Sequence, residues 1–224
     1  MNKFTFSVAG LAFLALAASS AQAAIIDDFS TGVYSGSINT GSLKSFQAGT
    51  MVGGDRHTHL EVQSSTGLSI QIDAVAGILA LSSQAQVDGF ACLTYGVAAP
   101  SSAPVADDMN LDLSAPDQFV INVLSYDLDT EFKIELYSST TGNTSSVTKT
   151  LTGQNTSSLT QVVFNYSEFT GINFGDIDRV LVKIDPLGEG DLVITSVEAV
   201  PEPATMALLA GAAALARRKR VKKA

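Results

Sequence analysis

Tryptophan is absent from the 224 residues, and cysteine occurs only once. A single cysteine cannot form an intramolecular disulfide, so the core alone must hold the fold together. Cys92 lies in the apolar string Phe90-Ala91-Cys92-Leu93, which favours a small core residue over a catalytic thiol. Without tryptophan, a stacking platform for sugars would depend on tyrosines. We expect packing roles for all five of them: Tyr34, Tyr95, Tyr126, Tyr137 and Tyr166.

Basic residues are scarce between residues 24 and 199. This stretch holds 21 of the 22 acidic residues but only six bases, which gives it a formal net charge of −15. A field of this sign repels nucleic acid and anionic membrane surfaces, and it is compatible with divalent cations. We therefore expect no nucleic-acid partner. The six bases are Lys44, Arg56, Lys133, Lys149, Arg179 and Lys183.

The sequence also lacks the motifs of common enzyme classes. It has no G-x-S-x-G elbow, no Walker loop, no H-E-x-x-H and no zinc-type cysteine and histidine spacing. The only histidines, His57 and His59, are two residues apart, so a Ser-His-Asp arrangement has little support. Nothing marks two of the acids as the carboxylate pair of a glycosidase. These absences predict a protein that is not an enzyme and has no catalytic residues.

The N-terminus has the three parts of a secretory signal peptide. Lys3 gives a positive start, residues 4–18 form an apolar core, and Ala21-Gln22-Ala23 is a small-x-small cleavage site. The sequence therefore predicts a helical signal peptide at residues 1–23, export by the Sec machinery and a mature chain that begins at Ala24.

The C-terminus, residues 200–224, also has three parts. Pro201-Glu202-Pro203 cannot form a regular element, because each proline ring fixes φ and removes an N–H donor. Residues 204–216 are apolar, and residues 217–223 carry six bases that should stay on the cytoplasmic side. As a helix the apolar part would be roughly 20 Å long against about 30 Å of hydrocarbon. This length suits a transient inner-membrane anchor better than a permanent one.

The order of these parts and the literal Val200-Pro201-Glu202-Pro203-Ala204-Thr205 resemble the PEP-CTERM sorting signal of Gram-negative bacteria, a tail also called the ice-binding protein C-terminal domain. The resemblance implies a preprotein held in the inner membrane until an exosortase-type transpeptidase acts near Pro-Glu-Pro. It further implies delivery to the cell surface, outer envelope or extracellular matrix, where exopolysaccharide is the expected partner. An ordinary tail anchor or a surface helix with a basic end is the alternative.

Residues 24–199 alternate apolar and polar side chains with a period of two. Clear examples are residues 68–74, 132–137 and 146–151. Other segments are apolar on both faces, as inner strands of a sandwich are: 119–124, 162–166, 180–184 and 192–197. Turn signals such as Thr141-Gly142-Asn143 separate them. The pattern predicts one all-β domain over residues 24–199, an antiparallel β-sandwich of the jelly-roll type.

This body resembles an uncharacterised domain found ahead of PEP-CTERM tails. The resemblance rests on Ile26-Asp27-Asp28-Phe29-Ser30, on Gly53-Gly54-Asp55-Arg56 and on Asp191-Leu192-Val193-Ile194, among other segments. The body is more distantly similar to galactose-binding-like jelly rolls, the fold of many carbohydrate-binding modules. That second likeness implies a fold and identifies no ligand.

Two groups of residues are candidates for binding a metal. His57, His59 and Glu61 share one face of a strand, because alternate residues point the same way, and they could bind a transition metal. The alternative, which we favour, is that they form the polar solvent face of an amphipathic strand. Arg56 just before them is expected to be buried in an ion pair with one of the acids.

Acidic turns form the second candidate. Carboxylates grouped in loops are the ligands that Ca²⁺ prefers, although no spacing here matches an EF-hand. Sandwiches of this kind often hold a structural calcium where the first and last strands meet. That position favours Asp27, Asp28 and Asp191, with solvated turn acids as the alternative that we favour.

Three functions remain open. The first is a structural or adhesive matrix protein associated with exopolysaccharide. The second is a carbohydrate-binding module, which should have a groove with coplanar exposed tyrosines. The third is an envelope hydrolase, which should have two carboxylates in a cleft.

Overall fold

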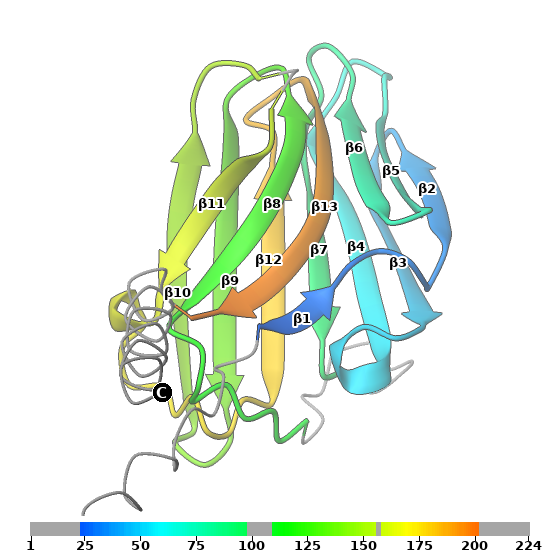
Figure 1. The fold of residues 1–224 in the computed structure, drawn as a ribbon. Helices are drawn as coiled ribbons and strands as arrows, with labels where there is room; N and C mark the ends of the chain where they lie inside the picture. Colours follow the sequence, from blue (N-terminus) through cyan, green and yellow to red (C-terminus); the bar gives the residue numbers. More distant parts are fainter. Residues whose placement is uncertain (1–22, 98–108, 156–157, 202–224) are drawn as a thin grey trace, which may run out of the picture.

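The computed structural model describes residues 23–97, 109–155 and 158–201. In this part of the chain, thirteen strands form two antiparallel sheets that pack face to face (Figure 1). The predicted antiparallel β-sandwich is therefore confirmed. The predicted signal-peptide helix and C-terminal apolar helix lie outside the described residues. None of the helices in the described ranges is long and apolar enough to cross a membrane.

One sheet, here called sheet A, has seven strands, and β1 (Ala24–Asp27) pairs with the C-terminal half of β13. The other strands of sheet A, in their spatial order, are β11 (Thr160–Asn165), β8 (Gln118–Tyr126), β13 (Gly190–Val200), β6 (Ile78–Ser83), β5 (Ile70–Val75) and β2 (Tyr34–Ile38).

The other sheet, sheet B, has six strands. In spatial order they are β10 (Asn143–Leu151), β9 (Thr130–Ser138), β12 (Arg179–Asp185), β7 (Asp88–Tyr95), β4 (Asp55–Ser64) and β3 (Gly41–Ala48). Two short 3₁₀ helices complete the fold: η1 (Val52–Gly54) and η2 (Tyr166–Glu168).

The core lies between the sheets and follows the period-two pattern. In β9, Phe132, Ile134 and Leu136 are fully buried, while Lys133 and Glu135 are partly exposed on the opposite face. β8 is buried from Gln118 to Val123 on both faces, as most of its apolar run predicts, but Leu124 at the end of that run is 45% exposed. Burial of these side chains is the main favourable contribution to folding.

The predicted turns connect the strands. Thr141-Gly142-Asn143 joins β9 to β10, with Gly142 at a φ of 66°, a backbone conformation that glycine adopts without a steric penalty. Between β12 and β13, the Asp185 carboxylate accepts the Leu187 backbone N–H at 3.1 Å. This is the local bond by which aspartate stabilises a turn.

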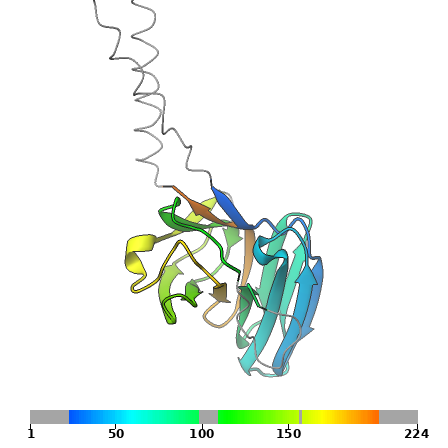
Figure 2. The ribbon, with the colours of Figure 1, turned by 90° about the horizontal axis from the view of Figure 1, so that it is seen from below.

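The described chain enters and leaves the sandwich at the same end. Ala24 of β1 pairs with Ala199 of β13, and β1 lies beside the end of β13 in the view from below (Figure 2). We call this the terminal end. The β2–β3, β4–β5 and β12–β13 connections lie at the opposite end (Figure 1), here called the distal end.

Candidate functional site

The terminal end joins the sandwich directly to the Pro-Glu-Pro triplet. Val200, the last residue of β13, pairs with Gln118, and its carbonyl accepts the Asp117 N–H at 3.1 Å. Pro201 is buried. The fold therefore extends to the first residue of the triplet without an intervening linker. Glu202, Pro203 and Ala21 lie outside the described residues.

A buried ion pair holds β1 against sheet B. Arg56 Nη1 lies 2.7 Å from Asp27 Oδ2, and the two side chains are 0% and 2% exposed. The Tyr95 hydroxyl donates to the same carboxylate oxygen at 3.0 Å, and Arg56 Nε donates to Gln47 at 3.2 Å. Arg56 Nη2 also donates to the Gly32 carbonyl, so each guanidinium nitrogen has a partner. The prediction that Arg56 is buried against an acid is confirmed, and the acid is Asp27.

The three candidate calcium ligands do not come together. β1 does meet the last strand, but Asp27 pairs with Val197, whereas Asp191 lies near the other end of β13. Six residues of strand separate the two positions, which is about 20 Å. The Asp28 carboxylate accepts the backbone N–H and hydroxyl of Ser30, and these bonds lower its pKa. Among the described residues, no group of three histidine, cysteine or acidic side chains could hold a metal ion.

The two histidines lie on β4 as predicted, on the face of sheet B that points away from sheet A. Thr58 on the same strand points to the core. His57 is only 5% exposed, because its ring stacks on Phe46 with centroids 4.4 Å apart, so the expected solvent face is largely covered there. His59 Nε2 lies 3.7 Å from Glu61 Oε2. Burial is the main reason that the pKa of each histidine is lowered, which favours neutral imidazoles.

Cys92 does not belong to the core between the sheets. It is half-buried on the outer face of sheet B, while Ala91 and Leu93 on either side point inward and are fully buried. The prediction placed it on the wrong face, because this string is apolar at every position and shows no alternation. Burial raises the pKa of the thiol to about 12, so it stays protonated at neutral pH.

Every lysine and arginine in the described ranges lies on a strand of sheet B. One line of outer positions crosses five neighbouring strands in register. Its residues, in spatial order, are Lys44, His59, Cys92, Lys183 and Lys133, and we call this line the basic row. The next outer positions toward the distal end form the acidic row: Glu61, Asp185 and Glu131. Sequence reasoning missed both rows because their members come from separate strands.

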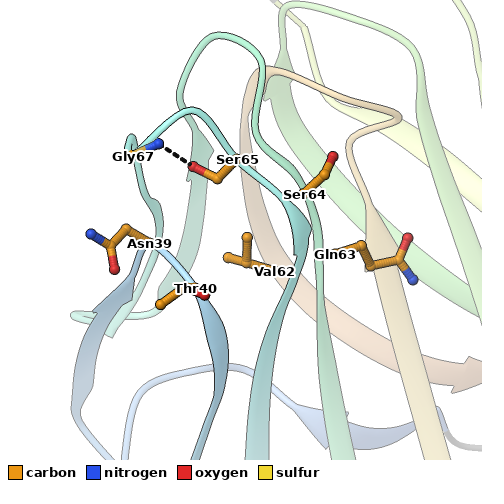
Figure 3. Close-up of a pocket in the computed structure, with 7 residues that line it drawn as sticks. All are labelled: Asn39, Thr40, Val62, Gln63, Ser64, Ser65 and Gly67. Carbon is orange, nitrogen blue, oxygen red and sulfur yellow. Dashed lines mark hydrogen bonds between the residues drawn. The ribbon is translucent and has the colours of Figure 1, made fainter.

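A pocket at the distal end has a volume of about 540 Å³ (Figure 3). Asn39 and Thr40 of the β2–β3 turn lie on one side of Val62, and the side chain of Gln63 points away from them. Ser65 and Gly67 close the pocket with a hydrogen bond of 3.0 Å. The pocket lining, completed by Ser64, contains no charged side chain. It therefore offers no carboxylate pair and no histidine, cysteine or acidic metal ligand.

A smaller pocket of about 210 Å³ is lined by Asp127, Glu189 and Asp191. Asp127 Oδ1 accepts the Asp191 backbone N–H at 2.7 Å, so this carboxylate holds two turns together. The volume is below the ~300 Å³ at which small-molecule sites begin. The pocket therefore gives weak support to a hydrolase.

The tyrosines pack as predicted. Tyr95 and Tyr126 are buried, and the other three are half-buried. Tyr166 stacks on Phe174 with centroids 3.9 Å apart, and the Tyr137 ring lies under the Arg179 guanidinium. None of the five side chains is fully exposed to solvent, so they do not form the coplanar platform expected of a sugar-binding module.

Comparison with known proteins identifies one family model, the PEP-CTERM protein-sorting motif, which matches residues 199–220. The match begins inside β13. The motif indicates an exported protein that is sorted to the cell surface. No curated protein sequence matches the chain.

Solved structures similar to the chain include the family 11 carbohydrate-binding module of the cellulosomal cellulase Lic26A-Cel5E of Clostridium thermocellum. Identity is 15%, the alignment covers 82% of this chain and 97% of that one, and the TM-score is 0.41. The agarase AgWH50C is 9% identical over 80% of this chain and 25% of its own, with a TM-score of 0.45. A mutant of the family 29 carbohydrate-binding module CBM29-2, complexed with mannohexaose, is 9% identical over 75% and 91%, with a TM-score of 0.35.

Proposed function

We propose that the chain is an exported, non-catalytic β-sandwich that is sorted by its C-terminal segment and serves as a structural or adhesive protein in association with exopolysaccharide. The observation that carries this proposal is the position of the sorting motif. Its match begins at Ala199, which is paired with Ala24 at the terminal end. Attachment through this end would leave the distal end and the outer faces of both sheets available to the surroundings.

In this proposal the Sec machinery exports a preprotein of a Gram-negative bacterium, and the apolar segment 204–216 anchors it transiently in the inner membrane. An exosortase-type transpeptidase then acts near Pro201-Glu202-Pro203. The fold is suited to an oxidising compartment because it needs no disulfide, and the half-buried Cys92 thiol remains protonated.

The pockets favour a non-catalytic role. The larger one has hydroxyl and amide groups but no acid, base or nucleophile pair, and the smaller one uses Asp127 to hold its own turns. The uncharged lining of the larger pocket keeps a carbohydrate-binding module as the alternative, because neutral sugars need hydroxyl and amide partners.

The sorting step can be tested in the full chain in a host that has the sorting enzyme. Glu202→Ala should abolish processing, because the triplet would lose its only charged side chain. Glu198→Ala is the matched control, since it removes an acid just outside the motif match. Immunoblotting of the shortened product measures both. Equal processing of the two variants would contradict the sorting function.

A further inference from the structure

One face of the described sandwich carries charges of both signs, so two copies could place opposite charges against each other there. The strands of sheet B carry six bases and six acids, whereas the strands of sheet A carry four acids and no base. The connections between strands carry the remaining acids of residues 24–199 and no base. Two copies that meet through sheet A or through the connections would bring like charges together, which is unfavourable. Because Arg56 and Lys149 point inward, the outer face of sheet B presents the other four bases beside six acids. It is the one face of the described strands that presents charges of both signs.

The charges on the outer face of sheet B are ordered in a specific way. On β4, β12 and β9, a basic-row side chain and an acidic-row side chain are two residues apart on the same outer face. β9 runs antiparallel to β12, and its acid precedes its base, so all three acids lie on the same side of the basic row. The pairs are His59 with Glu61, Lys183 with Asp185, and Lys133 with Glu131.

We propose that a second copy of this chain docks on the outer face of sheet B, related to the first by a two-fold axis that lies in the interface, parallel to the two rows and between them. This operation exchanges the rows and keeps each strand above its own counterpart. Lys183 then faces Asp185 of the second copy, and Lys133 faces its Glu131. The contact is isologous, so each pair occurs twice.

Docking would also relieve an unfavourable arrangement within the basic row. Lys183 and Lys133 are direct cross-strand partners, and like charges in such positions destabilise a sheet. Within one copy, Lys183 reaches Asp185 at 2.9 Å and Lys133 reaches Glu135 at 2.8 Å. The acidic row of the second copy would give each lysine a further carboxylate from above, where the single copy offers only solvent.

The available area fits a specific dimer. Six strands at about 4.8 Å spacing and eight to nine residues at about 3.3 Å give a face of roughly 650 Å² per copy. The total of about 1,300 Å² falls within the range of stable protein interfaces, about 1,200–2,000 Å². Half-buried Phe90 and Leu181 supply apolar surface among the charges. This proposal goes beyond the sorting function and does not depend on it.

The test uses the full chain in a density-matched detergent, with sedimentation equilibrium as the measurement. The double variant Lys133→Glu/Lys183→Glu makes both rows acidic and should weaken self-association by at least about tenfold, because like charges across an interface cost several kcal/mol. Lys149→Glu is the matched control. It reverses a lysine on β10 that pairs with Glu168 and lies outside the two rows, and it should associate like the parent.

A second variant, Glu131→Lys/Asp185→Lys, makes both rows basic and should also fail to self-associate. An equimolar mixture of the two double variants should restore a dimer, because every acidic row then meets a basic row. Circular dichroism checks that each variant is folded. A parent chain that stays monomeric would overturn the proposal, as would double variants that associate like the parent. A mixture that fails to associate, although both variants are folded and the parent is a dimer, would also overturn it.

Discussion

The two sheets of the sandwich satisfy their outward polar groups by different means. The outer face of sheet A uses uncharged donors: Gln161 Nε2 donates to Asn122 Oδ1 at 3.0 Å, and Asn122 Nδ2 donates to Ser196 Oγ at 2.8 Å. The Glu198 carboxylate accepts from Asn122 and from Ser196, so this acid is held by amide and hydroxyl groups and not by a base. The outer face of sheet B uses ion pairs, such as Lys183 with Asp185 and Arg179 with Glu135. All described lysines and arginines lie on this second sheet.

The two kinds of ion pair, at the outer face of sheet B and between the sheets, should differ in how much they matter for the stability of the fold. Ion pairs at a partly exposed surface contribute little to folding, about 0–1 kcal/mol each, so sheet B gains little stability from its charges. The ion pair whose disruption should cost most lies inside, where Arg56 reaches across from sheet B to Asp27 of sheet A. We therefore expect the inner pair to matter for stability, and the outer charges to matter for stability much less.

The sharpest test of this comparison is Arg56→Ala set against Lys183→Ala. Removing Arg56 should cost about 3–5 kcal/mol of unfolding free energy, because it leaves the Asp27 carboxylate buried without its counter-ion. Removing Lys183 should cost less than about 1 kcal/mol. Urea unfolding of residues 24–201 measures both values. Equal losses of unfolding free energy in the two variants would contradict the expectation that the inner ion pair matters more for stability than the outer ones.

A smaller effect is expected from pH, and it should come from sheet B alone. The pKa values of His57 and His59 are lowered in the folded protein, so the unfolded state binds more protons below about pH 6.5. Stability should therefore fall as pH decreases from 7 to 5, a window above the range in which carboxyl groups titrate. A loss of about 1 kcal/mol would lower the melting temperature by ~2–4 °C.

The histidine double variant His57→Gln/His59→Gln should flatten this dependence. Gln161→Ala on the outer face of sheet A is the control and should keep the slope of the parent. A slope that survives the removal of both histidines would assign the pH dependence to other groups.

No stabilisation is expected from calcium bound jointly by Asp27, Asp28 and Asp191, because about 20 Å of strand separates the first from the last. Melting curves of the mature chain in Ca²⁺ and in chelator should coincide. Binding to the native state would raise the melting temperature by mass action. A rise with Ca²⁺ that Asp191→Asn removes would restore the predicted site.

The fold could be predicted from the sequence further than the site could. The alternation of apolar and polar residues identified the strands and the inward side chains of β4 and β9. Such an assignment needs only the sequence of the one strand concerned. It failed for Cys92, where four consecutive apolar residues conceal which face is inner. It also could not place the candidate calcium ligands relative to one another: the first and last strands do meet, but the register that puts Asp27 beside Val197 is set by tertiary pairing. The two charged rows need the order of strands in space, which one sequence does not reveal.

The intact mass of the protein recovered from the surface of a sorting-competent host tests the central claim most directly. The account predicts a chain that begins at Ala24 and has lost the apolar and basic segments, residues 204–223, after processing near Pro201-Glu202-Pro203. Recovery of a chain that keeps residues 204–223 would contradict sorting by the C-terminal motif.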